Sequence, residues 1–399
     1  MSNLLYLAHR IPFPPNKGDK IRSYHTLKYL ARSHRIFLGA FVDDPGDWQY
    51  RDDLAGLCEE VFLCPLKSLH ARLRSINGFL RSSPLTLPYY DDRRMREWVM
   101  KIVREHDIRK VYVFSSSMAQ YLEDVDLTQA KSVLDLVDVD SDKWRQYSST
   151  KRWPMSWLYS REAYYLQKYE KKIANYFNVI TFVSDQEATF FKSIHPEYRN
   201  RISWFNNGVD CDYFSPDIAY PQVYKSGKEI MVFTGAMDYW ANADAVIWFV
   251  NEVYKEIHEA LPDSQLYIVG AKPGKAVKQL SEVPGVIVTG AVPDVRPYLA
   301  HANLSVAPLR IARGVQNKVL EAMSMGLPVV ATYAAVEGIL PSVIEQINIS
   351  DDPYQLRQLI IKIIQEGNSA LIKNSIRNSV LSVYGWDKNL AKLDGYYNQ

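Results

Sequence analysis

Short, almost continuously apolar segments recur along the chain, and segments with helical periodicity separate them. The first series occupies residues 4–8, 36–42, 61–66, 111–116, 133–138 and 179–184, and the second occupies residues 230–235, 266–271, 286–292, 304–309 and 328–332. Strands that are apolar on both faces are typical of a parallel sheet, because helices cover both of its faces. The two series therefore predict an α/β protein with two Rossmann-like, doubly wound parallel-sheet domains that face each other across a cleft.

The composition changes between the two series. Residues 211–228 contain two prolines, one glycine and several polar residues, which is typical of a linker. The last segment places Trp386, Leu390 and Leu393 at helical spacing. We therefore expect an N-terminal domain at residues 1–213, a C-terminal domain at residues 228–380 and a terminal helix within residues 381–399.

Charge and cysteine content narrow the class of protein. The 399 residues carry a net charge of only +2, which argues against a general nucleic-acid-binding protein. Cys58, Cys64 and Cys211 are sparse and lack metal-ligand spacing, which indicates a reducing compartment and no zinc site. The first apolar run is too short for a signal peptide, and no charge-free stretch is long enough to span a membrane. We expect a cytoplasmic location, with the inner face of the cytoplasmic membrane as the alternative.

Two segments mix basic with aromatic and aliphatic residues. They are residues 67–104 and residues 143–172, and the second contains Trp144, Trp153 and Trp157. Such surfaces suit a lipid-linked acceptor at an anionic membrane. They suit equally well amphipathic helices that pack on the sheet and direct their basic ends outward. Both interpretations remain open.

Residues 305–332 carry the most informative chemistry. A strand leads into a loop with Arg310 and Gly314, and a helix that starts near Asn317 carries Lys318 and Glu321. The backbone amides at residues 314–318 are placed to bind a diphosphate, with the helix dipole contributing. Lys318 would add a positive charge, and Glu321, one turn later, would accept both hydroxyls of a ribose. The alternative is a surface helix with an ordinary Lys–Glu pair, but the flanking loop and strand favour the binding site.

The same segment resembles a known family signature. Leu320–Met323, Gly326 and Pro328–Val330 are similar to the motif of the retaining glycosyltransferases of family 4 (group 1), which have the GT-B fold. The resemblance covers nearly the whole chain. The loop at residues 9–31 and residues 135–144 resemble one branch, the sugar transferases associated with PEP-CTERM/exosortase exopolysaccharide clusters. This resemblance implies a terminal helix that crosses back to the N-terminal domain.

The resemblance also implies the reaction and its partners. It implies a nucleotide-diphosphate sugar as donor, a saccharide or polyprenol-linked acceptor, retention of configuration, and no metal or other cofactor. It places the donor against the following residues: Gly18, Asp19, Gly235, Gly270, Val292, Gly314, Gln316, Asn317, Val319, Leu320 and Glu321. The chain departs from the family in two places. Arg313 stands where the family has a glutamate that contacts the sugar, and neither Arg nor Lys follows Gly235. Lys318 and Arg310 are then the candidates for neutralising the phosphate charge.

The acceptor side is expected in the N-terminal domain. Asp138 lies at a strand end where many family members have a histidine, and its carboxylate would orient the acceptor hydroxyl or accept its proton. Asp140 lies close by in the sequence. Lys20 and Arg22 are unfavourable at a helix start, so we expect them to face a ligand. Solvent exposure of the basic pair and helix capping by the aspartates remain the alternatives. The two DxD triplets are too short a pattern to indicate a metal site.

Two other functions share these features. The first is a nucleotide-sugar epimerase of the same fold, which would need no acceptor. The second is a non-catalytic nucleotide-sugar-binding subunit, which the two departures from the family motif would explain. A nicotinamide dehydrogenase is disfavoured because no GxGxxG follows the first strand of either domain.

Overall fold

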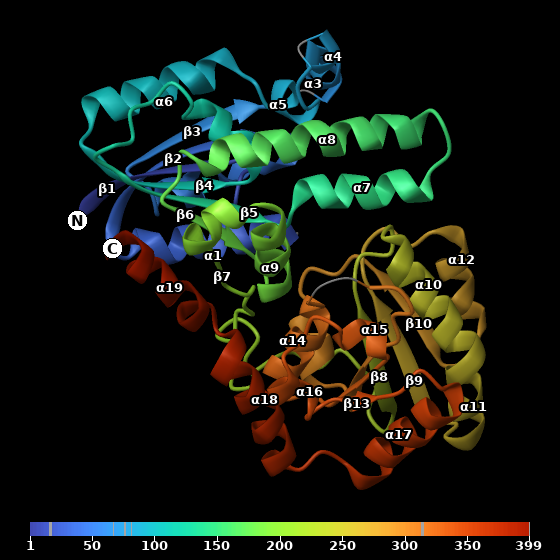
Figure 1. Cartoon of the computed structure of the whole chain (residues 1–399). Helices are drawn as coiled ribbons and strands as arrows, with labels where there is room; N and C mark the ends of the chain where they lie inside the picture. The colour runs from blue at the N-terminus through green and yellow to red at the C-terminus, as the bar shows by residue number, and fades with distance from the viewer. Residues whose placement is uncertain (16–17, 67, 76, 81, 313–314, 399) are drawn as a thin grey trace. The chain divides into compact units, whose positions relative to one another are not determined.

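The computed structural model describes residues 1–15, 18–66, 68–75, 77–80, 82–312 and 315–398. The chain forms two compact units: the first consists of Met1–Asn207 with Asp387–Gln399, and the second of Gly208–Trp386 (Figure 1). Within the described residues, each unit contains one sheet whose strands all pair in parallel. The expected fold, two doubly wound parallel-sheet domains, is confirmed.

The first unit contains a seven-stranded sheet in the order β3-β2-β1-β4-β5-β6-β7 among the described residues. Its central strands are apolar on both faces, and Leu4 and Leu7 of β1 are fully buried. The strands are β1 (Ser2–Ala8), β2 (His34–Val42), β3 (Glu60–Pro65), β4 (Ile108–Phe114), β5 (Lys131–Val137), β6 (Val179–Phe182) and β7 (Ile202–Trp204). The helices are α1 (Gly18–Ala31), η1 (Pro45–Tyr50), α2 (Arg51–Ala55), α3 (Ser68–Ser75), α4 (Asn77–Leu80), α5 (Thr86–Tyr89), α6 (Arg93–Glu105), η2 (Ser116–Tyr121), α7 (Asp140–Thr150), α8 (Met155–Ala174), α9 (Asp185–Ile194), η3 (Pro196–Arg201) and α19 (Trp386–Asn398).

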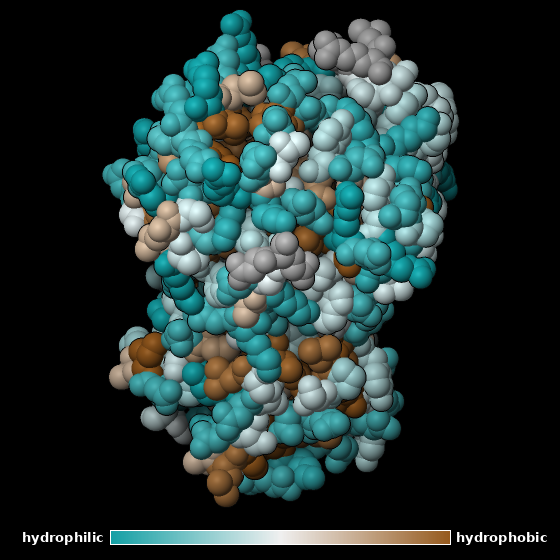
Figure 2. Space-filling model, turned by 60° about the vertical axis from the view of Figure 1, so that its left-hand side comes forward, coloured by the Kyte–Doolittle hydropathy of each residue, from teal (hydrophilic) through white to brown (hydrophobic). Residues whose placement is uncertain are grey.

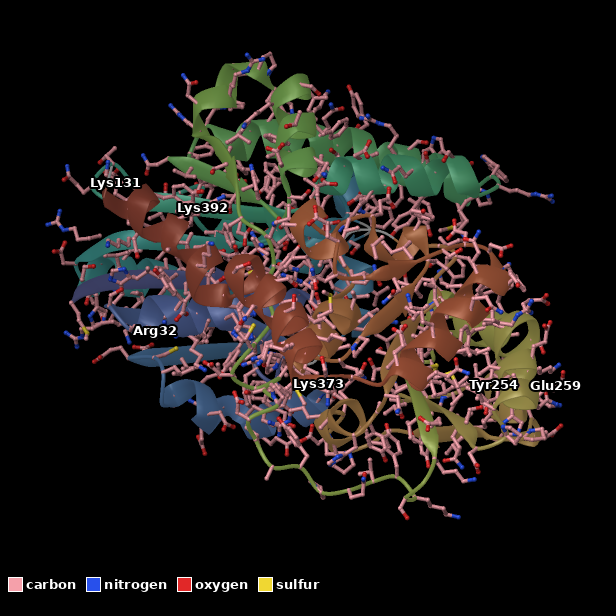
Figure 3. All side chains as sticks on the ribbon, turned by 90° about the horizontal axis from the view of Figure 1, so that it is seen from below. Arg32, Lys131, Tyr254, Glu259, Lys373 and Lys392 are labelled. Atoms are coloured by element: carbon pink, nitrogen blue, oxygen red, sulfur yellow. The ribbon has the colours of Figure 1, made fainter. Side chains whose placement is uncertain are left out.

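The second unit contains a six-stranded sheet in the order β10-β9-β8-β11-β12-β13 in the part of the chain that is described. The strands are β8 (Glu229–Thr234), β9 (Ser264–Val269), β10 (Val286–Gly290), β11 (Leu304–Ala307), β12 (Val329–Ala331) and β13 (Asn348–Ile349). The helices are α10 (Trp240–Phe249), η4 (Val250–Tyr254), α11 (Lys255–Ala260), α12 (Lys275–Gln279), η5 (Leu280–Glu282), α13 (Arg296–Ala300), α14 (Asn317–Ser324), α15 (Tyr333–Val336), α16 (Pro341–Ile344), α17 (Pro353–Glu366) and α18 (Ala370–Tyr384). A π-helical turn, η4, joins α10 to α11, and Figure 3 shows Tyr254 and Glu259 on this continuous helix.

The chain passes from the first unit to the second at residue 208, earlier than the sequence predicts. Residues 208–227 have the composition of a linker, but hydrogen bonds hold them to α18. Val209 donates its backbone N–H to the carbonyl of Tyr384 at 2.8 Å, and Arg377 donates to the carbonyl of Cys211 at 3.1 Å. These residues therefore belong to the second unit although they form no regular secondary structure of their own beyond turns.

Helix α19 packs on the first unit. Leu390 and Leu393 are fully buried, and Tyr397 donates its hydroxyl to the carbonyl of Val111 in β4 at 3.1 Å. Lys392, labelled in Figure 3, donates to the carbonyl of Trp204 at 3.0 Å. The apolar face of the helix and these two bonds fix the end of the chain on the sheet of the first unit.

The strand orders locate the ligand-binding edge of each sheet. The order reverses between β1 and β4 in the first unit, and between β8 and β11 in the second. In doubly wound sheets, ligands bind outside the carboxyl ends of the strands at this switch point. Residues that directly follow these four strands are therefore the first to consider for function.

The surface visible in Figure 2 is mostly hydrophilic, with hydrophobic residues in separate small patches. Among the helices described, none is both long enough and apolar enough to cross a bilayer.

Candidate functional site

In the second unit, the switch point is lined by two glycine turns in direct contact. Gly235 follows β8 and donates its N–H to the carbonyl of Val269 in β9 at 3.0 Å. A Cβ atom placed on Gly270 would lie 1.7 Å from the carbonyl oxygen of Gly235, so no other residue fits there without displacing the turn. The sequence-predicted positions Gly235 and Gly270 thus lie side by side at the carboxyl ends of neighbouring strands.

Asn242 is part of this site, although the sequence analysis did not select it. It lies in the first turn of α10 and is 7% exposed. Its Nδ2 donates to the carbonyl of Ala236 at 2.8 Å, and its Oδ1 accepts from Lys318 Nζ at 2.5 Å. The available signal in the sequence was an asparagine in the first turn of a mostly apolar helix. Its side chain holds the ammonium group of Lys318 against the Gly235 turn, where a Cβ atom would lie 3.0 Å from Nζ.

Lys318 and Glu321 are an electrostatically unusual pair on α14. Burial lowers the pKa of Lys318 from 10.5 to about 7, although the nearby Glu321 acts in the opposite direction. Burial likewise raises the pKa of Glu321 from 4.5 to about 7, against the influence of Lys318. Within the described part of the chain, the carboxylate of Glu321 makes no hydrogen bond. Both groups keep some solvent exposure, so a ligand can still reach them. Strongly perturbed titratable groups at a ligand-binding edge are candidate functional residues.

Two of the predicted residues on α14 can offer only their backbone to a ligand. Gln316 is the N-cap residue, and Asn317 begins the helix. The side chains of Val319 and Leu320 are each 1% exposed and pack into the core, so only their backbone could contact a ligand. The predicted Gly314, like Arg313, lies outside the described residues. Val292 follows β10 and is half-buried.

Arg310 follows β11, across the switch point from Gly235. Its guanidinium group makes a two-pronged ion pair with Asp244 of α10, at 2.5 and 3.0 Å. It also lies 6.0 Å above the ring of Trp248. The guanidinium group, which the sequence predicts to neutralise a phosphate, is therefore already paired with a carboxylate. Half of the Arg310 side chain is exposed. To bind a phosphate, Arg310 would have to exchange this partner.

In the first unit, two residues other than glycine adopt left-handed backbone conformations at the ligand-binding edge. Ser115, after β4, has φ 83°, and Val137, at the end of β5, has φ 69°. This conformation is costly for a β-branched residue and is found most often at functional sites. The irregular turn at Val137 shifts the register between β5 and β6, and it leads directly to Asp138.

The two predicted aspartates lie beyond this turn. Asp138 forms an ion pair with Lys143 of α7. Asp140 begins α7 and accepts a hydrogen bond from the hydroxyl of Ser116 at 3.1 Å. Burial raises the pKa of Asp140, while the charge of Lys143 opposes this effect. One lysine thus lies close to two carboxylates, Asp138 and Asp140.

His9 occupies the switch point of the first unit, and the sequence analysis missed it. It follows β1, its ring stacks on Phe114 at the end of β4 with centroids 5.7 Å apart, and its Nε2 lies 3.4 Å from Asp19. Asp19 also pairs with Arg10. Burial alone would raise the pKa of Asp19, but the hydrogen bond and charge of His9, together with Arg10, hold it well below its ordinary value. Gly18, at the exposed start of α1, precedes this cluster. The position directly after β1 was the available signal.

Lys20 and Arg22 do not face a ligand, contrary to the sequence prediction. Lys20 is 1% exposed and pairs with Asp47 at 2.6 Å. Arg22 is fully buried and pairs with the equally buried Asp135 at 2.7 Å. It also lies 3.8 Å above the ring of Phe205. Both basic side chains are tolerated near the start of α1 because each has a buried acidic partner.

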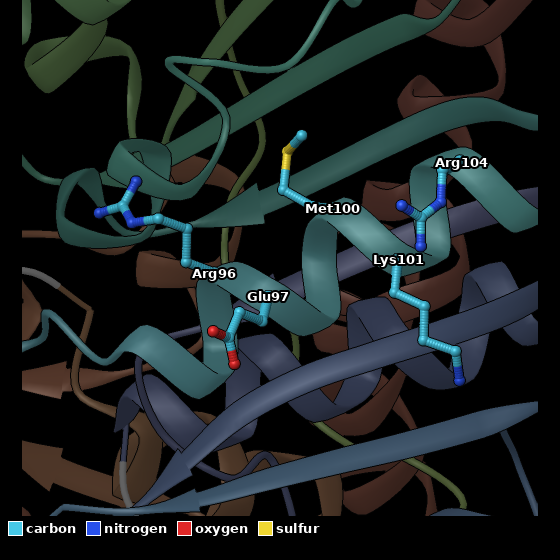
Figure 4. Close-up of a pocket in the computed structure, with 5 residues that line it drawn as sticks. All are labelled: Arg96, Glu97, Met100, Lys101 and Arg104. Atoms are coloured by element: carbon cyan, nitrogen blue, oxygen red, sulfur yellow. The ribbon is translucent and has the colours of Figure 1, made fainter.

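A separate hollow lies on the exposed face of α6. Figure 4 shows its lining by Arg96, Glu97, Met100, Lys101 and Arg104. It carries charges of both signs. No group of three or more His, Cys, Asp or Glu side chains with metal-ligand geometry occurs in the described ranges. Independence from metal ions stays a prediction.

Comparisons with known proteins agree with this architecture. Residues 228–366 match the family "Glycosyl transferases group 1". No curated protein matches the sequence significantly.

Several solved structures are similar over almost their whole length. The Anabaena protein Alr3699/HepE in complex with UDP has a TM-score of 0.66 at 14% identity, covering 99% of both chains. Sucrose-phosphate synthase from Thermosynechococcus elongatus has a TM-score of 0.65 at 14% identity, covering 100% of this chain and 99% of that one. A glycosyltransferase from Rickettsia africae has a TM-score of 0.64 at 15% identity, covering 100% and 98%. The chain thus has the GT-B fold, and the match of its second unit to the group 1 glycosyl transferases supports a GT-B glycosyltransferase.

Proposed function

We propose that this protein transfers a sugar from a nucleotide-diphosphate sugar to a saccharide or a polyprenol-linked saccharide. The observation that carries the proposal is the Lys318–Glu321 pair beside the Gly235 turn, at the switch point of a unit that matches group 1 glycosyl transferases. The similar protein Alr3699/HepE has been solved in complex with UDP and with UDP-glucose, which favours a uridine nucleotide.

The pair fits the two ends of a nucleoside diphosphate. A diphosphate would supply the negative charge that Lys318 lacks, and the backbone amides at the start of α14 would donate to its oxygens. The hydroxyls of a ribose would donate to the carboxylate of Glu321, which makes no hydrogen bond with the described residues. In the reaction, the bond between the sugar's anomeric carbon and the phosphate oxygen breaks, and the acceptor oxygen bonds to that carbon. The acceptor loses its proton, and Lys318 stabilises the diphosphate that leaves.

The acceptor would bind at the strand ends of the first unit. Asp138 and Asp140 are the candidates for orienting its hydroxyl and for taking up its proton, and burial raises the pKa of Asp140, which favours proton uptake there. Retention of configuration, a role in exopolysaccharide or cell-surface glycan synthesis, and a location at the inner face of the cytoplasmic membrane follow from the resemblance and belong to the proposal. So does independence from metal ions.

A thermal-shift screen of UDP-, GDP-, ADP- and dTDP-sugars tests the donor site, because a ligand that binds only the folded state raises the melting temperature. Glu321→Ala and Lys318→Ala should each remove the shift while the fold remains intact. If both variants keep the full shift, the site assignment is wrong. Incubation of the best donor with oligosaccharides in the presence of EDTA then tests transfer, and NMR of the product gives the anomeric configuration.

The same experiments separate the two alternatives. Conversion of the donor's sugar without any acceptor would identify an epimerase. Tight donor binding without turnover on any acceptor would identify a non-catalytic binding subunit.

A further inference from the structure

One end of the first unit exposes large apolar side chains next to basic ones. The aromatic-basic surface, as we call it, is built from α3, α4, the loop between α7 and α8, and the start of α8. Its exposed apolar members and their exposed fractions are Leu69 (73%), Leu73 (66%), Phe79 (40%), Trp153 (81%), Met155 (40%) and Trp157 (56%). Single exposed apolar residues are ordinary, but six on adjoining elements indicate an interaction site.

Direct contacts hold these elements together. The rings of Phe79 and Trp157 stack with centroids 6.2 Å apart. Arg161 of α8 donates to the carbonyl of Gly78 at 2.7 Å, and its guanidinium group lies 4.6 Å from the centre of the Phe79 ring. Figure 1 shows α3 and α4 beside the amino-terminal part of α8. Segments about 80 residues apart in the chain therefore form one surface.

The charge of this surface is of one sign. Lys151 and Arg152 are exposed, and residues 67–90 and 151–161 contain no Asp or Glu. The nearest acidic residue along α8, Glu162, is 2% exposed and accepts hydrogen bonds from the backbone N–H groups of Leu85 and Thr86. Through these bonds the carboxylate holds the two segments together, and it is buried beneath the surface.

The hollow on α6 provides a contrast within the same unit. Met100 is 46% exposed there and is also flanked by Arg and Lys. However, Arg93 pairs with Glu97 at 2.6 Å, and Lys101 lies 3.8 Å from Glu105. The basic charges of α6 are therefore neutralised in place, whereas those of the aromatic-basic surface have no acidic neighbour in their own segments.

We propose that the aromatic-basic surface docks the protein on an anionic lipid bilayer. Tryptophan and leucine side chains would enter the boundary between headgroups and acyl chains, and the basic side chains would contact anionic headgroups. A neutral apolar partner would leave the exposed charges of Lys151 and Arg152 uncompensated, and a second copy of the same surface would repel the first. This inference rests on the membrane location that the proposed function includes, but the surface does not depend on the transfer reaction, so docking and sugar transfer can each fail without the other.

Co-sedimentation with lipid vesicles tests the proposal on the full chain. The protein should bind vesicles that contain phosphatidylglycerol, bind those of phosphatidylcholine alone at least tenfold more weakly, and dissociate as the salt concentration rises. Trp153→Ser combined with Trp157→Ser should weaken binding at least tenfold, and so should Lys151→Gln combined with Arg152→Gln. The matched control, Met100→Ser with Lys101→Gln on α6, should bind like the wild type.

The opposite results would overturn the proposal. These are absence of vesicle binding at low salt, equal binding to both kinds of vesicle, wild-type binding by the two surface variants, or equal loss in the α6 control. Self-association of the wild type that the Trp153/Trp157 variant abolishes would mark the surface as an interface between copies instead. The nucleotide-induced thermal shift, measured on the same variants without lipid, should not change. If the Trp153/Trp157 variant loses that shift, its fold is disturbed. Vesicle binding by the Lys151/Arg152 variant, with an unchanged shift, then decides whether the surface docks on the bilayer.

Discussion

Glu321 should affect stability and binding in opposite directions. Its carboxyl has a pKa raised from 4.5 to about 7 by burial, so the folded protein holds a proton there between these pH values and the unfolded chain does not. Stability therefore falls as the pH rises through this window, and the loss is complete above about pH 7. The full shift corresponds to about 3 kcal/mol.

Glu321→Gln keeps the shape of the side chain and removes its charge. Part of the gain is offset because the charged carboxylate also stabilises the ammonium group of Lys318. We expect the unliganded variant to be about 1–2 kcal/mol more stable than the wild type at pH 8. At pH 5 the wild-type carboxyl is protonated in the folded state, and most of the difference should disappear.

The same substitution, Glu321→Gln, should weaken nucleotide binding. A hydrogen bond to a charged group contributes about 1.5–3 kcal/mol, so loss of the carboxylate should weaken donor binding by about 10–150-fold. Urea unfolding at pH 5 and pH 8 measures the first effect, and titration calorimetry with the donor from the thermal-shift screen measures the second. Glu282→Gln, on an exposed residue of the same unit, is the matched control and should change neither. The reasoning is refuted if Glu321→Gln destabilises the unliganded protein at pH 8, or if it binds the donor with wild-type affinity.

Three further predictions concern other parts of the site and the fold. Lys318 must be protonated to bind a diphosphate, and its pKa is about 7, so donor affinity should fall by up to about tenfold per pH unit above pH 7. Calorimetry in buffers of different ionisation enthalpy should show proton uptake on binding. Binding that does not depend on pH would contradict this prediction. Gly270→Ala should abolish donor binding because its Cβ would strike the Gly235 turn, whereas Gly274→Ala, with nothing within 4 Å, should be tolerated, and equal thermal shifts would count against the assignment. Arg22→Met should cost about 3–5 kcal/mol in urea unfolding because it leaves a buried charge unpaired. Arg32→Met, which breaks an exposed ion pair, should lower the free energy of unfolding by less than about 1 kcal/mol. Similar losses of stability in the Arg22 and Arg32 variants would contradict the prediction that burial sets the cost.

The apolar runs along the chain predicted most of the strands. Each of the eleven runs coincides with a strand of one of the two parallel sheets. Two strands were missed, β7 (Ile202–Trp204) and β13 (Asn348–Ile349), which have three and two residues. Strands this short carry no periodicity of their own, and only pairing with the neighbouring strand defines them.

Polar side chains were harder to place than apolar ones. The sequence identified Lys318 and Glu321 because a local motif surrounds them. It could not show that Asn242, 76 residues earlier, holds the ammonium group of Lys318. Nor could it show that Arg22 pairs with Asp135, 113 residues later. A lone charged residue in a sequence gives no information on whether its partner is water, a ligand or another side chain.

The sequence by itself determined the fold class, the two-domain organisation and the segment that is proposed to bind the nucleotide. These depend on local patterns, namely the spacing of apolar residues and the turn residues at strand ends. Only the tertiary structure decided that Arg22 and Lys20 are buried, that His9 stands at a switch point, and that Trp157 stacks on Phe79 in one surface. The physical reason is that burial and pairing depend on contacts between segments distant in the chain, and the free energy of a charge changes far more with those contacts than with its neighbours in sequence.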